Sequence, residues 1–238
     1  MKDSFQFKQF LVRQDRSAMK VTTDACLFGA WAASESARSG TALDIGTGTG
    51  LLSLMLAQQT QLVIDAIEID TDACAQAREN AESSPWKDRI RVRQGDALNT
   101  PANTTYDVII SNPPFYEKQL KSDDQRRNIA HHGESLTLGQ LAAVIQQLLA
   151  PGGSFFTLLP YRRSSEIGRL LKRSALAAMK TVFVRQSPNH SYFRLMLKGC
   201  LAGEQPGPAE IGEISIWNAE QQYTDEFRAL LKKYYIIF

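Results

Sequence analysis

Three glycines at alternate positions are the residues whose spacing first points to chemistry. In residues 41–50, Thr-Ala-Leu-Asp-Ile-Gly-Thr-Gly-Thr-Gly, an apolar run with one acid ends before Gly46, Gly48 and Gly50, and a second apolar run follows. Strand, glycine-rich turn and helix are the local architecture of a nucleotide site in a doubly wound sheet. Glycines let backbone approach a ligand without Cβ clashes, and the start of a helix presents unpaired N–H groups. These residues therefore predict a site for a nucleotide-like ligand.

The spacing of the glycines favours one kind of ligand. The dinucleotide fingerprint Gly-x-Gly-x-x-Gly needs a glycine at position 51, where this chain has Leu51. From Asp44 to Gly50 the chain reads Asp-x-Gly-x-Gly-x-Gly, which resembles the first motif of the class I methyltransferases, whose cofactor is S-adenosylmethionine. The motif alone leaves open a nicotinamide dinucleotide, or a loop that serves only strand–helix packing.

Two acidic residues stand at the ends of further predicted strands. Glu68 follows the apolar residues 62–67 and lies eighteen residues beyond Gly50, close to the spacing of about 20 at which an acid hydrogen-bonds ribose. Asp96 follows a short alternating strand at 89–93 and could accept the amino group of an adenine. The alternatives are a surface carboxylate at position 68 and a turn aspartate at position 96.

A fourth predicted strand ends in an unusual turn. Residues 106–111 are a strong buried-strand signal, and they run directly into Asn112, Pro113, Pro114 and Phe115. Two prolines forbid continuation of a strand and stiffen the turn. This turn is expected at the carboxyl end of the fourth strand, beside the glycine-rich turn, at the point where ligands bind in doubly wound sheets.

These motifs together resemble the amino-methyltransferases of the Asn/Asp-Pro-Pro-Tyr/Phe type, over about residues 20–160. The resemblance implies an α/β fold with a doubly wound, seven-stranded sheet whose last strand is antiparallel. It also implies that the Asn112 side-chain oxygen and the Pro113 carbonyl accept the two N–H bonds of a target amine, while Phe115 stacks on its base. Positioning and preorganised dipoles supply the catalysis, without a metal or a covalent intermediate.

Two stretches within the first 40 residues resemble a more specific family. The opening Phe-Gln-Phe-Lys-Gln-Phe and the later Ala-Met-Lys-Val-Thr-Thr-Asp-Ala-Cys-Leu-Phe-Gly-Ala-Trp are similar to one bacterial family along its full length. That family methylates N6 of the adenine just 3′ of the anticodon, adenine 37, in a valine tRNA. By this resemblance the residues that line the S-adenosylmethionine site are Thr23, Asp44, Gly46, Thr47, Gly48, Gly50, Glu68, Asp96, Ala97 and Asn112.

Other substrates stay open at this point. The same tetrapeptide serves enzymes that methylate another RNA amine, such as the N2 of a ribosomal guanine, or the side-chain amide of a protein glutamine. The glutamine enzymes carry a separate helical N-terminal domain, for which 40 residues leave little room. A module that binds S-adenosylmethionine without catalysis is a further alternative, against which the intact turn at 112–115 argues.

Two basic segments are candidates for contact with tRNA phosphates. The first is the N-terminal extension, residues 1–22, where a short hairpin is expected to carry Lys8, Arg13 and Arg16. The second is the polar loop at 116–134, expected to be mobile, which carries Lys118, Lys121, Arg126 and Arg127. Both could instead be ordinary surface: an arm packed on the domain, and a solvated insertion.

Composition fits one globular domain, residues 1–238. The chain is 43% hydrophobic and 22% charged, with a net charge of +2 that neither requires nor opposes nucleic acid. Its three cysteines have no metal-ligand spacing, and no apolar run approaches the roughly 20 residues of a membrane span. We therefore expect a cytoplasmic protein without metal, membrane attachment or obligate protein partner.

The remaining elements follow from periodicity and breakers. Helices are expected at 23–33, 137–149, 164–173 and 223–235, and a further strand at 154–159. The last two strands, 177–185 and 192–201, should form an antiparallel hairpin. Residues 203–212, rich in Pro and Gly, are expected to be a linker.

Overall fold

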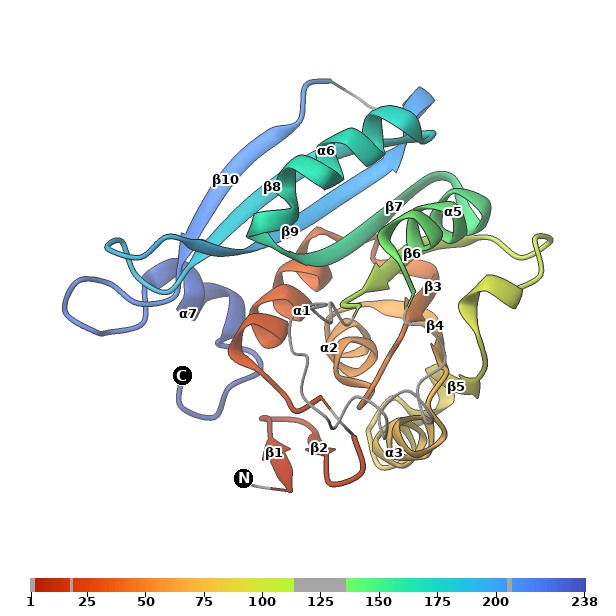
Figure 1. Ribbon diagram of the computed structural model, residues 1–238. Helices are drawn as coiled ribbons and strands as arrows, with labels where there is room; N and C mark the ends of the chain where they lie inside the picture. The colour runs from red at the N-terminus through yellow and green to blue at the C-terminus, as the bar shows by residue number, and fades with distance from the viewer. Residues whose placement is uncertain (1–2, 18, 114–135, 205–206) are drawn as a thin grey trace, which may run out of the picture.

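The computed structural model describes residues 3–17, 19–113, 136–204 and 207–238. Within these residues, a small sheet pairs β1 (Ser4–Gln6) with β2 (Leu11–Arg13), and a second sheet has eight strands. The strands of the large sheet are β3 (Ser39–Ile45), β4 (Gln61–Glu68), β5 (Ile90–Gln94), β6 (Tyr106–Ser111), β7 (Leu149–Pro160), β8 (Leu176–Arg185), β9 (Tyr192–Leu201) and β10 (Glu210–Ser215). They lie side by side in the order β10-β8-β9-β7-β6-β3-β4-β5 (Figure 1).

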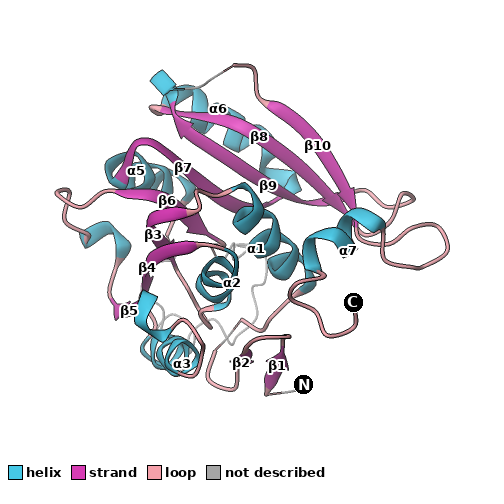
Figure 2. Ribbon diagram, turned by 180° about the vertical axis from the view of Figure 1, so that it is seen from behind, coloured by secondary structure: helices cyan, strands magenta, loops and turns pink. Residues whose placement is uncertain are grey.

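Helices cover both faces of the large sheet (Figure 2). They are α1 (Thr23–Glu35), α2 (Leu51–Gln59), α3 (Thr71–Glu82), α5 (Leu138–Leu148), α6 (Ser164–Arg173) and α7 (Asp225–Leu231), with single 3-10 turns at Lys87–Arg89, Ala97–Asn99, Tyr161–Arg163 and Ala202–Glu204. Apolar residues of α1, α2 and α7 share one core, and those of α5 and α6 share another. Strand β6 contributes residues to both cores: Val108 and Ile110 belong to the first, and Ile109 belongs to the second.

Five neighbouring strands, β7, β6, β3, β4 and β5, run parallel, so their carboxyl ends meet at one edge of the sheet. We call this the carboxyl edge. The chain leaves it after Ile45, Glu68, Gln94, Ser111 and Pro160. Strand β3 pairs with both β4 and β6, so the strand order reverses beside β3, which is where open α/β sheets bind ligands.

The expected doubly wound sheet with an antiparallel last strand is confirmed. Strand β9 runs antiparallel to both β7 and β8, and β3 to β9 are the seven strands of the expectation. The linker expected at 203–212 is wrong at its end, because β10 begins at Glu210 and adds an eighth strand parallel to β8. An ion pair of 2.6 Å between Glu213 and Arg185 joins the two strands, which local composition could not reveal.

The N-terminal hairpin is present and packs on the body of the protein. Phe7 and Phe10 are buried with their rings stacked 4.4 Å apart, and the ring of Tyr235 lies 6.1 Å from that of Phe7. The ammonium group of Lys8 donates to the carbonyl oxygens of Lys232 and Phe238, both at 2.6 Å. The hairpin therefore holds the carboxyl end of the chain in place.

Candidate active site

The glycine-rich turn connects β3 to α2 and is open on its outer side. Gly46, Gly48 and Gly50 all have positive φ, 69°, 57° and 81°, a region that side chains with Cβ rarely adopt. A Cβ added at Gly46 or Gly48 would meet no atom of the described residues within 4 Å. Gly50 is the N-cap of α2 and offers no side chain to the free N–H groups of the helix. The turn thus leaves room for a ligand, although the N–H groups of Gly46, Gly48 and Gly50 already donate within the protein.

Asp44 lies directly beneath this turn and is fully buried. Its Oδ2 accepts hydrogen bonds from the hydroxyls of Thr47, at 2.6 Å, and Ser53, at 2.7 Å. Its Oδ1 is buried and has no hydrogen-bond partner among the described residues. Burial raises the pKa of this carboxyl from 3.8 to about 6, against the lowering effect of the two hydroxyls. The lone pairs of Oδ1 stay available to a ligand or a bridging water.

Of the two residues that donate to Asp44, the sequence analysis named Thr47 as a site residue and did not name Ser53. Thr47 is among the predicted cofactor residues, and its hydroxyl donates to Asp44. Ser53 was not anticipated, although a single hydroxyl within the apolar run of α2 is a signal that a buried polar group needs a donor.

Glu68 ends β4 and faces the same turn from the neighbouring strand. It is 9% exposed, its Oε2 accepts the N–H of Gly48 at 2.8 Å, and its Oε1 accepts the N–H of Asp70 at 3.0 Å. Each carboxylate oxygen keeps a second lone pair, which is the acceptor that a ribose hydroxyl requires. The carboxylate therefore fixes the shape of the turn and can still accept from a ligand.

Asp96 and Ala97 lie beyond β5, next along the carboxyl edge. The N–H of Gly95 donates to the Glu68 carbonyl at 2.9 Å, which ties this loop to the end of β4. Asp96 is half-buried and its Oδ1 accepts the N–H of Leu98 at 2.9 Å, while Ala97 is buried. Residues 95–97 therefore lie at the carboxyl edge, next to Glu68.

Thr23, another predicted cofactor residue, lies in the first turn of α1. The preceding Thr22 is the N-cap of this helix. Asp24 forms an ion pair with Arg194 of β9, with Oδ2 and Nε 2.6 Å apart. Thr23 and Asp24 line a pocket of about 250 Å³ together with residues of β9 and of the segment after β10.

The turn after β6 stands next to the glycine-rich turn. Ser111 is level with Ile45 in the parallel pairing of β6 and β3, and its hydroxyl donates to the Ile45 carbonyl at 2.8 Å. Asn112 and Gly46 are the next residues along the two strands, which lie about 5 Å apart. Asn112 is half-buried and Pro113 is buried, whereas Pro114 and Phe115 lie outside the described residues. The Asn112 turn and the glycine-rich turn therefore leave neighbouring strands at the same level of the sheet.

Asn80 is a positioning residue that the sequence did not reveal. Its side-chain amide donates to the carbonyls of Thr49 and Arg13, both at 2.8 Å, and its Oδ1 accepts the N–H of Arg13 at 2.9 Å. It is 2% exposed. One buried side chain of α3 therefore joins the glycine-rich turn to the N-terminal hairpin, and no local pattern in an amphipathic helix announces this.

The predicted RNA-contacting cations fall into three groups. Lys8 binds the carboxyl end of the chain, as described above. Arg16 forms an exposed ion pair with Glu79 at 2.8 Å, and Arg13 has an exposed side chain on β2. The remaining four, Lys118, Lys121, Arg126 and Arg127, lie outside the described residues.

Within the described ranges, His, Cys, Asp and Glu side chains nowhere form a group that could hold a metal ion. The three cysteines are buried and free. Among the same residues, every helix is too short or too polar to cross a lipid bilayer.

Known proteins resemble this chain along nearly its whole length. Residues 30–154 match the methyltransferase small domain family. The tRNA1(Val) (adenine(37)-N6)-methyltransferase of Dyadobacter fermentans is 41% identical over 236 residues, 98% of each chain, and that of Parabacteroides distasonis is 38% identical over 234 residues, 98% of this chain and 97% of the relative. The chain belongs to this methyltransferase family.

The fold has counterparts among solved structures. A predicted O-methyltransferase from Agrobacterium tumefaciens superposes with a TM-score of 0.67 over 87% of this chain and 95% of its own, at 12% identity. A likeness at that identity speaks for the fold alone, which is the class I methyltransferase fold.

The buried carboxyl of Asp44 makes stability depend on pH. A carboxyl whose pKa rises on folding binds its proton more tightly in the folded chain, so its contribution to stability falls as pH rises through about 6. We therefore expect the difference in free energy of unfolding, Asp44→Asn minus native protein, to rise between pH 4 and pH 7 by on the order of 3 kcal/mol. Urea titrations of the cofactor-free proteins at several pH values measure this, and a difference independent of pH would contradict it.

Replacing Asn80 by alanine should loosen the glycine-rich turn. The change leaves the buried carbonyl of Thr49 and the part-buried N–H and carbonyl of Arg13 without their partner. A buried group left unpaired costs about 1–3 kcal/mol, and the Arg13 groups cost less because Arg13 is exposed to water. We expect Asn80→Ala to lose roughly 2–5 kcal/mol of stability and to bind cofactor more weakly. Thermal unfolding and calorimetric titration measure the two effects. The matched control is Glu82→Ala, at an exposed position of the same helix, which should change neither.

Proposed function

We propose that this protein transfers a methyl group from S-adenosylmethionine to N6 of adenine 37 in a valine tRNA. The observation that carries the proposal is the position of Asn112 and Pro113, level with the glycine-rich turn at the point where strand order reverses. Relatives aligned over nearly the whole chain are named for that reaction. The coarser part of the proposal, methyl transfer by a class I methyltransferase, also rests on the family match.

The residues of the glycine-rich turn and its neighbours fit S-adenosylmethionine. The open side of Gly46 and Gly48 would admit the ligand, and the unpaired Oδ1 of Asp44 would accept from its amino-acid part, directly or through water. Glu68 would accept from the ribose, and Asp96 with Ala97 would bracket the adenine. Thr23, Thr47 and Gly50 complete the proposed set. When bound, this cofactor supplies an electrophilic methyl group on a sulfonium.

The turn after β6 would prepare the attacking nitrogen. An adenine N6 is a poor nucleophile because its lone pair is delocalised into the ring. The Asn112 side-chain oxygen and the Pro113 carbonyl would accept its two N–H bonds, draw the nitrogen toward tetrahedral geometry and localise the lone pair. The new bond joins N6 to the methyl carbon, the carbon–sulfur bond breaks with its electron pair left on sulfur, and N6 then loses one proton to solvent. Phe115 is proposed to stack on the extruded base.

Labelled methyl transfer tests the proposal directly. Unmodified valine tRNA transcripts and S-adenosylmethionine with an isotopic methyl group are incubated with the protein, and the RNA is digested to nucleosides. We expect N6-methyladenosine from the normal transcript and no label from a transcript with guanine at position 37. Label in N2-methylguanosine, or only in glutamine residues of added protein, would overturn the assignment of the substrate.

Replacing Asn112 by alanine should separate binding from chemistry. Its amide oxygen acts on the target amine, and removing one such preorganised group typically costs about 100- to 1,000-fold in kcat. We expect Asn112→Ala to show that loss while cofactor affinity stays within a few-fold. Steady-state kinetics and calorimetry measure the two quantities. Asn99→Ala, at an exposed position after β5, is the matched control and should retain full turnover.

A further inference from the structure

Helix α6 and the 3-10 turn before it form a concentrated basic segment. Residues 161–173 contain five basic residues and one acidic residue, a net charge of +4 against +2 for the whole chain. The one acid, Glu166, is held by Arg163 in two hydrogen bonds of 2.8 Å. By contrast, the neighbouring helix α5 on the same face of the sheet has no charged residue. The charge is therefore a local feature of one element.

The basic residues share the outer face of this element. Ile167 is buried and Leu170 and Leu171 are half-buried against the core, while the exposed cations are Arg162, Arg169, Lys172 and Arg173. Hydrogen bonds from Arg163 lower the pKa of Glu166, and the charge of Arg169 adds to this lowering, so most of the positive charge of this element is not neutralised by its one acid. At 1.5 Å per residue the row from Arg162 to Arg173 is roughly 16 Å long, enough for several successive phosphates.

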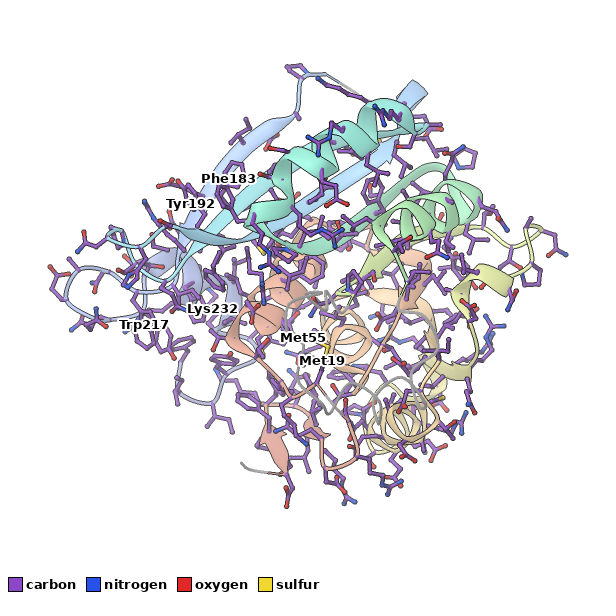
Figure 3. All side chains as sticks on the ribbon, in the orientation of Figure 1. Met19, Met55, Phe183, Tyr192, Trp217 and Lys232 are labelled. Carbon is purple, nitrogen blue, oxygen red and sulfur yellow. The ribbon has the colours of Figure 1, made fainter. Side chains whose placement is uncertain are left out.

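The row begins at the carboxyl edge, at the end of the strand next to the one that carries the proposed catalytic turn. Strand β7 pairs with β6, Thr157 level with Ser111, and ends at Pro160, so the chain enters Tyr161 at the carboxyl edge. The ring of Tyr161 is 36% exposed and rests against Phe183 and Tyr192, with centroids 5.5 and 5.3 Å away. Phe183 and Tyr192 lie near the start of α6 (Figure 3). A braced, exposed ring at this point suits stacking with an unpaired base.

Gly168 adds an independent observation. It lies in the middle of α6 on the exposed face, and a Cβ there would meet no atom of the described part of the chain within 4 Å. Packing among these residues therefore does not require glycine, which is the poorest helix former apart from proline. The missing side chain leaves helix backbone accessible between Ser165 and the cations Arg169 and Lys172, where a phosphate backbone could approach closely.

We propose that this basic face, Arg162, Gly168, Arg169, Lys172 and Arg173 with Tyr161 at its head, docks the stem that adjoins the methylated loop of the RNA substrate. Tyr161 would stack with a loop nucleotide next to the target, and the cations would bind phosphates of the stem as it leaves the carboxyl edge. The inference rests on the proposed function and adds a surface that directs the RNA along the α6 side of the sheet.

The test uses one charge variant and one glycine variant of the full chain. We expect R169A/K172A to weaken tRNA binding roughly tenfold and to reduce its salt slope by about 1.5. We expect Gly168→Gln to weaken tRNA binding while raising the temperature of unfolding, a pair of effects that a merely structural position would not give. Cofactor affinity should be unchanged in both, and KM for tRNA should rise with kcat unchanged.

Two control variants make related chemical changes elsewhere. Lys87→Ala removes an exposed cation before β5, at the opposite edge of the sheet, and Ala229→Gln adds the same side chain to the exposed face of α7. Both should bind tRNA as the native protein does. If both α6 variants keep the tRNA affinity and salt slope of the native protein, the docking surface is wrong. It is also wrong if R169A/K172A loses binding to lipid vesicles, which the native protein and the controls show, but still binds tRNA normally. Failure of the native protein to methylate tRNA would instead overturn the proposed function.

Discussion

The pairing of β3 with β6 is the constraint on which the site depends. Because Ile45 and Ser111 are level, and the Ser111 hydroxyl binds the Ile45 carbonyl, the glycine-rich turn and the Asn112 turn leave the sheet side by side. Parallel strands a single spacing apart allow little relative movement, so the distance between cofactor and target would be fixed by backbone hydrogen bonds. Methyl transfer needs such fixed alignment more than it needs acid–base groups.

The glycine-rich turn keeps its shape through three buried side chains. Asp44 supports it from below, Glu68 holds the Gly48 N–H from β4, and Asn80 holds the Thr49 carbonyl from α3. Burial of the Asp44 carboxyl is unfavourable for the empty protein, as its raised pKa shows. Groups whose placement costs stability are common where a ligand must be bound, because the ligand satisfies them.

The two halves of the carboxyl edge differ in chemistry. On the β3-β4-β5 side, the strands end in the glycine-rich turn and the acidic residues Glu68 and Asp96, where we propose that the cofactor binds. On the β7-β9-β8 side, Tyr161 and Tyr192 lie at this edge, and the cations of the α6 segment continue from it along the face of the sheet toward the opposite edge. Under the proposed function, the small cofactor and the large RNA would therefore approach Asn112 from opposite sides. This arrangement would avoid repulsion between the carboxylate of the cofactor and the phosphates of the RNA.

The sequence by itself determined the strand–turn–helix units, because apolar runs and glycine or proline breakers are local signals. The boundaries of α6 at Ser164 and Arg173, the hairpin β8–β9, and the acids and turns of the carboxyl edge were all predicted in this way. Contacts between distant segments were decided only by the tertiary structure. Asn80 reaches Arg13 from 67 residues away, Lys8 binds the carboxyl end, and β10 finds its partner in β8. Such pairings depend on which surfaces the packed sheet brings together, and no local pattern records them.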